Sequence, residues 1–245
     1  MNEATAHTLD RLRSGALAGA TRLDLTGGLT DFPREVFDLA DSLEVLNLSG
    51  NALSQLPADF ARLSRLRILF CSENRFTHLP EVLGQCPQLD MVGFKSNRIS
   101  EVSAAALPPR LRWLILTDND IAALPAELGR RPRLQKLMLA GNRLTALPDS
   151  MAACRQLELL RIASNRFEQL PDWLFTLPRL SWLAFAGNPV AQASEENAVI
   201  AHPVPDIHWP GLQLQEVLGQ GASGVIHRAR WKSAAHVGAA AGERF

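Results

Sequence analysis

The sequence predicts an α/β solenoid, in which short parallel strands form a curved sheet on the concave face and irregular or helical segments cover the convex face. Three observations predict it. The pattern LxxLxLxxN, with other apolar residues at some leucine positions, recurs every 22 or 23 residues. A Leu-Pro pair recurs at a fixed place after it, and an amphipathic segment precedes the first copy. Seven copies begin at Leu43, Leu66, Leu89, Leu111, Leu134, Leu157 and Leu180, and a degenerate first copy begins at Ala20.

The N-terminal segment can form an amphipathic helix over residues 4–18, with Leu9, Leu12 and Leu17 on one side. The first unit of a repeat array has one face without a neighbour, and such units are atypical. We therefore expect residues 1–19 to form a helical cap that shields the first strand.

Each copy builds one strand and one turn. In the second copy, Leu43, Leu46 and Leu48 take alternate inward positions, and Asn51 follows at the turn. An asparagine amide both donates and accepts hydrogen bonds, so it can satisfy backbone groups that the turn leaves inside. Stacked asparagines should therefore form a ladder. Its members are Asn51, Asn74, Asn97, Asn119, Asn142, Asn165 and Asn188.

Two copies depart from the pattern. The fourth copy is one residue short, with Val102 and Ser103 where Leu-Pro belongs and a Pro108-Pro109 pair before the next strand. We expect a local change of the convex side there. The first copy has Thr26 and two glycines where its asparagine should stand, as befits a terminal unit.

The period and signature resemble those of the leucine-rich repeat over residues 20–188, which gives eight copies. The LxxLPxxLxxLxxL spacing is similar to that of intracellular Ras-group scaffolds, and of bacterial proteins that join such repeats to a serine/threonine kinase. The resemblance implies a protein-interaction module that binds a protein partner on its concave face.

Residues between the inward leucines of each strand point to the concave face. They predict a partner-binding surface, the concave ridge, made of nine apolar side chains with a lysine and an arginine among them. An exposed apolar surface of this size marks a contact surface, and its residue types are those enriched at interfaces. The alternatives are mutual packing, coverage by a terminus, or a homodimer. The ridge consists of Val45, Ile68, Phe70, Met91, Trp113, Ile115, Lys136, Met138, Leu159, Arg161 and Trp182.

Composition excludes several classes of partner and cofactor. Lys+Arg and Asp+Glu both total 25, which argues against nucleic acid or a membrane surface as partner. The sequence has no secretory signal and no spanning segment, and its cysteines fall on interior repeat positions, which predicts a cytoplasmic protein. Arginine outnumbers lysine 22 to 3, which favours a bacterial source. The six histidines have no metal-binding spacing, so we expect no metal.

The segment 189–211 has four prolines and no period, which predicts a linker after the solenoid closes at Asn188-Pro189. Residues 212–218 and 225–231 then suit the two arms of a β-hairpin. Between them, Gly219, Gly221 and Gly224 form a GxGxxG pattern.

With a hairpin around it rather than a following helix, this pattern resembles the glycine-rich loop of a protein kinase, and a chance glycine-rich turn is the alternative. The resemblance implies ATP as ligand in a full-length kinase relative. The chain lacks the strand-three lysine and the HRD and DFG elements, so we expect no enzymatic activity and no cofactor. We interpret residues 212–245 as a truncated kinase N-lobe start with a divergent tail. The second hypothesis is an ATP-dependent serine/threonine kinase that selects substrates with its repeats.

Overall fold

The computed structural model describes residues 2–201, 209–221 and 224–231. The chain divides into two compact units, Met1–Glu195 and Glu196–Phe245. The first unit holds the repeats, and the second holds the hairpin.

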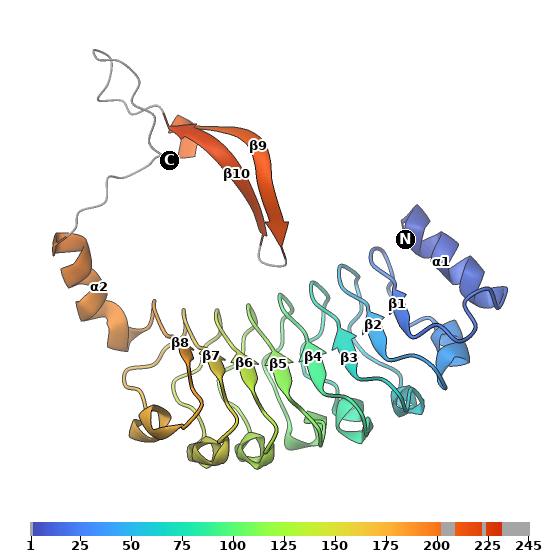
Figure 1. Ribbon diagram of the computed structural model, residues 1–245, viewed down its shortest axis with the longest axis horizontal. Helices are drawn as coiled ribbons and strands as arrows, with labels where there is room; N and C mark the ends of the chain where they lie inside the picture. The colour runs from blue at the N-terminus through green and yellow to red at the C-terminus, as the bar shows by residue number, and fades with distance from the viewer. Residues whose placement is uncertain (1, 202–208, 222–223, 232–245) are drawn as a thin grey trace. The chain divides into compact units, whose positions relative to one another are not determined.

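The first unit contains one parallel sheet of eight strands in sequential order. Successive strands follow the inner side of an arc and short 3-10 helices follow its outer side (Figure 1). This confirms the predicted fold class. The strands are β1 (Arg22–Asp24), β2 (Val45–Asn47), β3 (Ile68–Phe70), β4 (Met91–Gly93), β5 (Trp113–Ile115), β6 (Lys136–Met138), β7 (Leu159–Arg161) and β8 (Trp182–Ala184). The 3-10 helices of this unit are η1 (Arg34–Leu39), η2 (Phe60–Arg62), η3 (Glu81–Gln85), η4 (Ala104–Ala106), η5 (Ala126–Arg130), η6 (Asp149–Ala153) and η7 (Asp172–Thr176).

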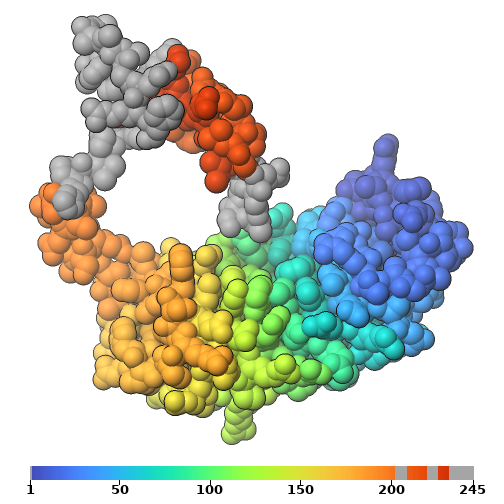
Figure 2. All heavy atoms as spheres, viewed as in Figure 1, coloured from blue at the N-terminus to red at the C-terminus, as the bar shows by residue number. Residues whose placement is uncertain are grey.

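The strands pair so that equivalent positions of successive copies lie side by side. Leu46 pairs with Leu23 on one side and Leu69 on the other, and the same register continues to β8. These central leucines point inward and are buried. Burying one such side chain stabilises the fold by about 1.5–3 kcal/mol, so the core grows with each copy. In Figure 2 the copies stack without breaks across the face that is shown.

Helix α1 (Glu3–Arg13) is capped by Asn2, whose side chain accepts a hydrogen bond from the Thr5 amide at 2.8 Å. Leu9 and Leu12 are buried against the first copy. The predicted helix over residues 4–18 was too long. It ends at Arg13 because Gly15 adopts a φ of 75° and its amide bonds to the Leu12 carbonyl, which closes the helix.

The cap also replaces the asparagine that the first copy lacks. The Asn2 side chain and the Thr5 hydroxyl both donate to the Thr26 carbonyl, at 2.7 and 2.9 Å. From the other side, the Asn51 Oδ1 atom accepts from the amides of Gly27 and Leu29. The Thr26 carbonyl and the Gly27 and Leu29 amides are therefore satisfied at this end of the array.

The asparagine ladder is present. Asn119 is typical, since its Oδ1 accepts from the Ile99 amide at 2.9 Å and its Nδ2 donates to the carbonyls of Phe94 and Leu116 at 3.0 Å. Each asparagine thus joins its own turn to the preceding copy.

The residue before each ladder asparagine has a left-handed backbone. Glycine occupies this place at Gly50, Gly141 and Gly187, with φ between 68° and 70°. Non-glycine residues adopt the same conformation elsewhere, with φ between 53° and 56°, which carries a steric cost that glycine avoids. These residues are Glu73, Ser96, Asp118 and Ser164.

The short fourth copy carries the 3-10 helix η4, which has three residues, whereas η3 and η5 on either side have five each. The second copy, which has the regular length, also has a three-residue helix, η2. An isolated β-bridge joins His78 to Glu101 just before this point.

The predicted linker over residues 189–211 begins with a regular element, helix α2 (Pro189–Ala201). Pro189 suits the first helical position, and the alanines and glutamates that follow are good helix formers, although they lack an amphipathic period. The Glu195 carboxylate also accepts from the Gly187 amide at 2.8 Å. Residues 202–208 lie outside the described residues, and η8 (Trp209–Gly211) follows them.

The second unit contains the predicted hairpin. Strands β9 (Leu212–Gly221) and β10 (Gly224–Trp231) pair antiparallel, with register irregularities on either side of His227. Apolar side chains along both arms, including Leu218 and Ile226, are exposed. The tail after Trp231, with Lys232, lies outside the described residues.

Candidate functional site

The concave ridge follows one row of strand positions. Register pairs Val45 with Ile68, then Met91, Trp113, Lys136, Leu159 and Trp182 in turn. Paired residues of neighbouring strands lie about 4.8 Å apart and share a face of the sheet. The predicted ridge residues at the third position of each copy, which is the first residue of each strand, are therefore brought together in one continuous row.

A second row carries the other predicted ridge residues. Phe70, Ile115, Met138 and Arg161 are aligned by the same register, with Gly93 between Phe70 and Ile115. A Cβ atom on Gly93 would lie 2.7 Å from Phe70 Cδ1. The Phe70 ring therefore occupies the space that a side chain at Gly93 would need.

Exposure varies along the ridge. Met91 is 8% exposed, which corrects its prediction as a solvent-facing residue, because it lies between the apolar side chains of Ile68 and Trp113. At the C-terminal end, Trp182 is 56% exposed. Most other members are half-buried, so the accessible part of the surface is concentrated toward its C-terminal strands.

Cationic groups lie over the aromatic rings of the ridge. Lys136 Nζ is 3.9 Å from the centroid of the Trp113 ring, and Arg112 Cζ is 5.5 Å from it. Arg161 Cζ lies 6.0 Å from the Trp182 ring. Such contacts contribute about 0.5–1 kcal/mol when exposed, and they hold the cations in place. The ridge thus combines apolar area with fixed positive charge.

The three cysteines take no part in this surface. Cys71, Cys86 and Cys154 are buried and free. Burial raises the pKa of Cys86 and Cys154 to about 11 and that of Cys71 further still. A buried thiol with a raised pKa is a poor nucleophile and a poor metal ligand, so these side chains serve the core.

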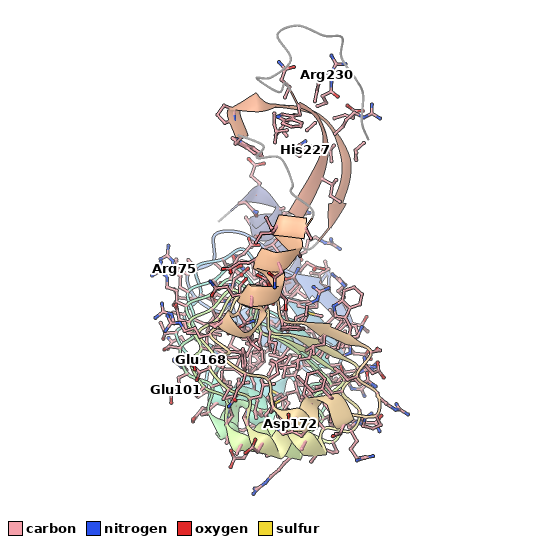
Figure 3. The ribbon with its side chains drawn as sticks, turned by 90° about the vertical axis from the view of Figure 1, so that its left-hand side faces the viewer. Arg75, Glu101, Glu168, Asp172, His227 and Arg230 are labelled. Carbon is pink, nitrogen blue, oxygen red and sulfur yellow. The ribbon has the colours of Figure 1, made fainter. Side chains whose placement is uncertain are left out.

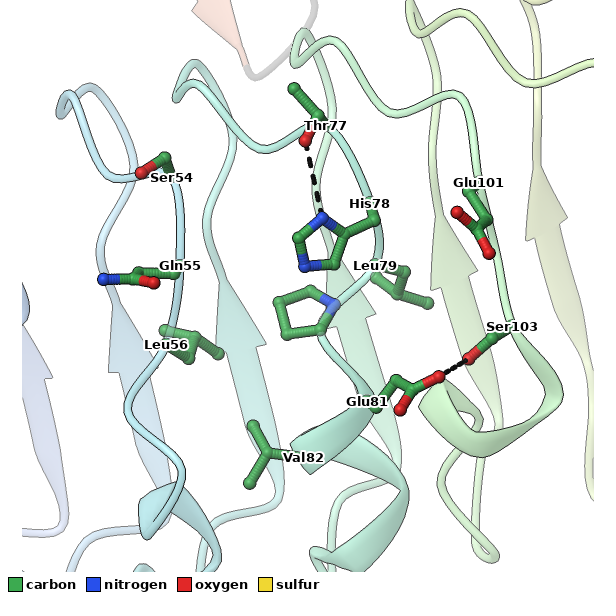
Figure 4. Close-up of a pocket in the computed structure, with 11 residues that line it drawn as sticks. Ser54, Gln55, Leu56, Thr77, His78, Leu79, Glu81, Val82, Glu101 and Ser103 are labelled. Carbon is green, nitrogen blue, oxygen red and sulfur yellow. Dashed lines mark hydrogen bonds between the residues drawn. The ribbon is translucent and has the colours of Figure 1, made fainter.

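A second candidate is a shallow hollow on the outer flank of the third copy (Figure 4). Ser103 Oγ donates to Glu81 Oε1 at 2.8 Å there, and Thr77 Oγ1 lies 3.4 Å from His78 Nδ1. Both contacts join side chains that are exposed to solvent. We assign this hollow no chemistry. It is lined by Ser54, Gln55, Leu56, Thr77, His78, Leu79, Pro80, Glu81, Val82, Glu101 and Ser103.

Within the described residues no group of three or more His, Cys, Asp or Glu side chains is placed to hold a metal ion. The search for spanning helices over the same part of the chain finds none of sufficient length and apolarity to cross a bilayer.

The glycines of the kinase-like pattern lie at the end of the hairpin. Gly221 pairs with Gly224, and Gly219 pairs with Ile226. Residues 222 and 223 between the arms lie outside the described residues.

Sequence reasoning missed a cluster of arginines at the edge where the strands begin. Arg110 and Arg112 flank the opening leucine of the fifth copy, and Arg131 and Arg133 precede that of the sixth. The signal was available in the segments PRLR and RRPRL, which place basic residues at equivalent positions of neighbouring copies.

Comparison with known proteins agrees with this architecture. A family described as "Leucine rich repeat" matches residues 18–76 and 132–190. The solenoid is a leucine-rich repeat fold. A leucine-rich repeat protein of Leptospira interrogans shares 24% identity and a TM-score of 0.56 over 76% of this chain and 60% of that one. The Toll–Spatzle complex of Drosophila matches with 26% identity and a TM-score of 0.58 over 68% of this chain and 23% of that one.

Curated relatives match part of the chain only. The human PH domain leucine-rich repeat-containing protein phosphatase 1 is 34% identical over 92 residues, which is 37% of this chain and 5% of that protein. The Dictyostelium discoideum protein named probable inactive serine/threonine-protein kinase roco10 is 34% identical over 110 residues, 41% of this chain and 4% of its own. The chain therefore spans a small fraction of the length of these relatives.

Proposed function

We propose that this leucine-rich repeat solenoid is a protein-interaction module that binds its partner on the concave ridge. The observation that carries the proposal is the unbroken row from Val45 to Trp182, which ends in a tryptophan that is 56% exposed. Tryptophan, methionine and arginine are enriched at the centres of protein interfaces, and the ridge supplies all three.

A protein is favoured over a small molecule because the ridge extends from β2 to β8. Small ligands bind in concave pockets that enclose most of their surface, whereas this row is shared by successive strands. Among the similar structures, the Toll–Spatzle complex and the plant receptor kinase GASSHO1/SCHENGEN3 with CASPARIAN STRIP INTEGRITY FACTOR 2 are complexes with protein ligands. They support the proposal by analogy.

The experiment compares Trp182→Asp with Phe175→Asp in affinity purification with quantitative mass spectrometry from the source organism. Both aromatic residues are exposed, but Phe175 lies in the preceding copy, on 3-10 helix η7 of the convex side. We expect the partner to be lost with Trp182→Asp alone.

Calorimetry with the purified partner should then show a loss of about 2 kcal/mol or more, roughly a thirtyfold weaker affinity. A partner retained by Trp182→Asp and lost with Phe175→Asp would place the contact on the convex side. If light scattering shows a dimer that Trp182→Asp dissociates, the ridge serves a second copy of the chain.

We also propose that the module belongs to a cytoplasmic, kinase-linked signalling protein. The support is the hairpin with Gly219, Gly221 and Gly224, together with relatives that carry kinase and phosphatase names. In this proposal, ATP is a ligand only of a full-length kinase relative, which supplies the lysine and the Mg²⁺ ligands. Thermal-shift and phosphotransfer assays test it. We expect no effect of Mg-ATP on this chain, and stabilisation that Gly221→Asp abolishes would make it a nucleotide-binding protein.

A further inference from the structure

Four arginines gather at one edge of the solenoid, where the chain turns from the convex side into strands β5 and β6. We call Arg110, Arg112, Arg131 and Arg133 the arginine edge. Arg110 and Arg133 occupy equivalent positions of successive copies, as do Arg112 and Gln135, so the register of the sheet sets them side by side. Loops that follow the strands lie at the opposite edge, where Figure 3 shows Arg75 and Glu168.

Part of this edge surrounds one hollow. Its lining consists of Arg112, Pro132, Arg133, Gln135 and Gln156. The polar groups of that lining are two guanidinium groups and two amides, and no carboxylate is among them. The neighbouring arginines are oriented by short contacts, because Arg110 donates to the Gln88 Oε1 atom at 2.6 Å and Arg131 donates to the Leu107 carbonyl at 3.2 Å.

The arginine edge differs from those positions of the solenoid where an arginine pairs with a carboxylate of an adjacent copy, as Arg34 does with Asp59 at 2.6 Å and Arg67 with Asp90 at 3.6 Å. In the described part of the chain, no carboxylate lies within 4.0 Å of an arginine-edge guanidinium.

Two arginine-edge atoms, Nε of Arg112 and Nε of Arg131, are buried without a hydrogen-bond partner in the same described part. A chain of zero net charge thus concentrates positive charge here that has no direct carboxylate partner.

We propose that the arginine edge binds an acidic segment of a protein, a short run of aspartate or glutamate residues. A guanidinium group can donate two parallel hydrogen bonds to one carboxylate. Several guanidinium groups in fixed positions can therefore bind several carboxylates of one segment at once. The cluster spans only neighbouring copies, about 5 Å apart. Asp90 and Glu158 stand in the copies on either side and would repel a longer polyanion such as nucleic acid. A short acidic peptide therefore fits better.

This site lies at the edge of the sheet, and its test does not depend on the partner of the concave ridge. Fluorescence anisotropy would follow a labelled oligoglutamate peptide, with an oligoglutamine peptide of the same length as the uncharged probe. At roughly 50 mM salt we expect the full chain to bind oligoglutamate and not oligoglutamine. Its affinity for oligoglutamate should fall at roughly 300 mM salt, because salt screens exposed charges.

The variant Arg112→Gln/Arg133→Gln should weaken oligoglutamate binding about tenfold or more. Its matched control is Arg75→Gln/Arg166→Gln, which removes the same charge at the opposite edge and should bind like wild type. If the first variant fails to fold by circular dichroism, Arg110→Gln/Arg133→Gln replaces it, since both of those side chains are exposed.

Three results would overturn the proposal. The first is equal binding of oligoglutamate and oligoglutamine, and the second is an equal loss of oligoglutamate affinity in the arginine-edge variant and in its control. The third is displacement of oligoglutamate by an oligothymidylate of the same charge that binds more tightly. The last result would assign the edge to nucleic acid. Retained binding in Trp182→Asp would show that the arginine edge acts separately from the ridge.

Discussion

The ring of Phe70 lies over Gly93 on the concave face, where a Cβ atom at Gly93 would stand 2.7 Å from Phe70 Cδ1 and 3.2 Å from Cε1. The two residues are cross-strand partners on β3 and β4. The absence of a side chain at one position therefore determines where the aromatic ring of the neighbouring copy packs.

Gly93→Ala should displace this ring and lower the free energy of unfolding by about 1–3 kcal/mol, the usual cost of overpacking. Urea denaturation measures it. In a double-mutant cycle, Gly93→Ala should cost much less in a Phe70→Ala background, with a coupling of about 1 kcal/mol or more. Additive effects would mean that the ring is free to move away.

Asn119→Ala should destabilise the solenoid by about 3 kcal/mol or more. The substitution leaves the Ile99 amide and the Phe94 and Leu116 carbonyls short of a partner, at about 1–3 kcal/mol for each group left buried. Chemical denaturation would compare it with Glu168→Ala, an exposed site at which we expect a change within about 0.5 kcal/mol. Similar losses in the two variants would contradict the structural role of the ladder.

Gly141→Ala should cost more than Gly50→Ala, although both glycines have a φ of 68°. The backbone conformation alone costs a non-glycine residue roughly 1–2 kcal/mol. At Gly141 the new Cβ would also meet Asp118 Oδ1 at 2.5 Å, whereas at Gly50 it would meet nothing within 4 Å. Thermal denaturation of the two variants separates the cost of the backbone conformation from the cost of the contact with Asp118. Equal decreases in Tm would show that the Asp118 side chain moves aside.

The Arg34–Asp59 pair predicts a pH dependence with a definite sign. Hydrogen bonds from Arg34, followed by those from Arg62, lower the pKa of Asp59 from 3.8 to about 2. A carboxyl with a lowered pKa in the folded state contributes stability above its unfolded pKa and loses it as the pH falls toward 2. The difference in Tm between wild type and Asp59→Asn should be constant above pH 4, roughly, and shrink below it. It should be small, because both partners are exposed.

The buried cysteines predict a reactivity pattern. With the pKa of Cys86 and Cys154 raised to about 11 by burial, and that of Cys71 raised as well, little thiolate is present at neutral pH. We expect no reaction with a disulfide reagent in native buffer and full reaction of all three thiols in denaturant. Rapid labelling of one cysteine in the native protein would reveal local opening of its copy.

Much of the fold could be predicted from the sequence because repeats interact mainly with their neighbours. The leucine spacing located each strand, and the turn asparagines identified the ladder. The helix ends were less certain. The N-terminal helix stops at Arg13 through the conformation of Gly15, and helix α2 forms where prolines and the missing period predicted a linker.

The sequence predicted which side chains share the concave face, but not how exposed each of them is. Strand alternation determined that Trp113 and Trp182 face the concave side, because successive residues of a strand point to opposite faces. Sequence could not show that Met91 is buried or that Lys136 lies over Trp113, since both depend on the side chains of adjacent copies.

By itself, the sequence determined the eight-copy solenoid, its inward leucines and its asparagine turns, because these follow from a local pattern repeated along the chain. Only the tertiary structure decided which exposed charges are neutralised. Arg34 and Arg67 find carboxylates in adjacent copies, whereas Arg112 and Arg133 lie around a hollow that has none. The physical reason is that charge pairing depends on distances between copies about 23 residues apart, which the stacking of the solenoid sets.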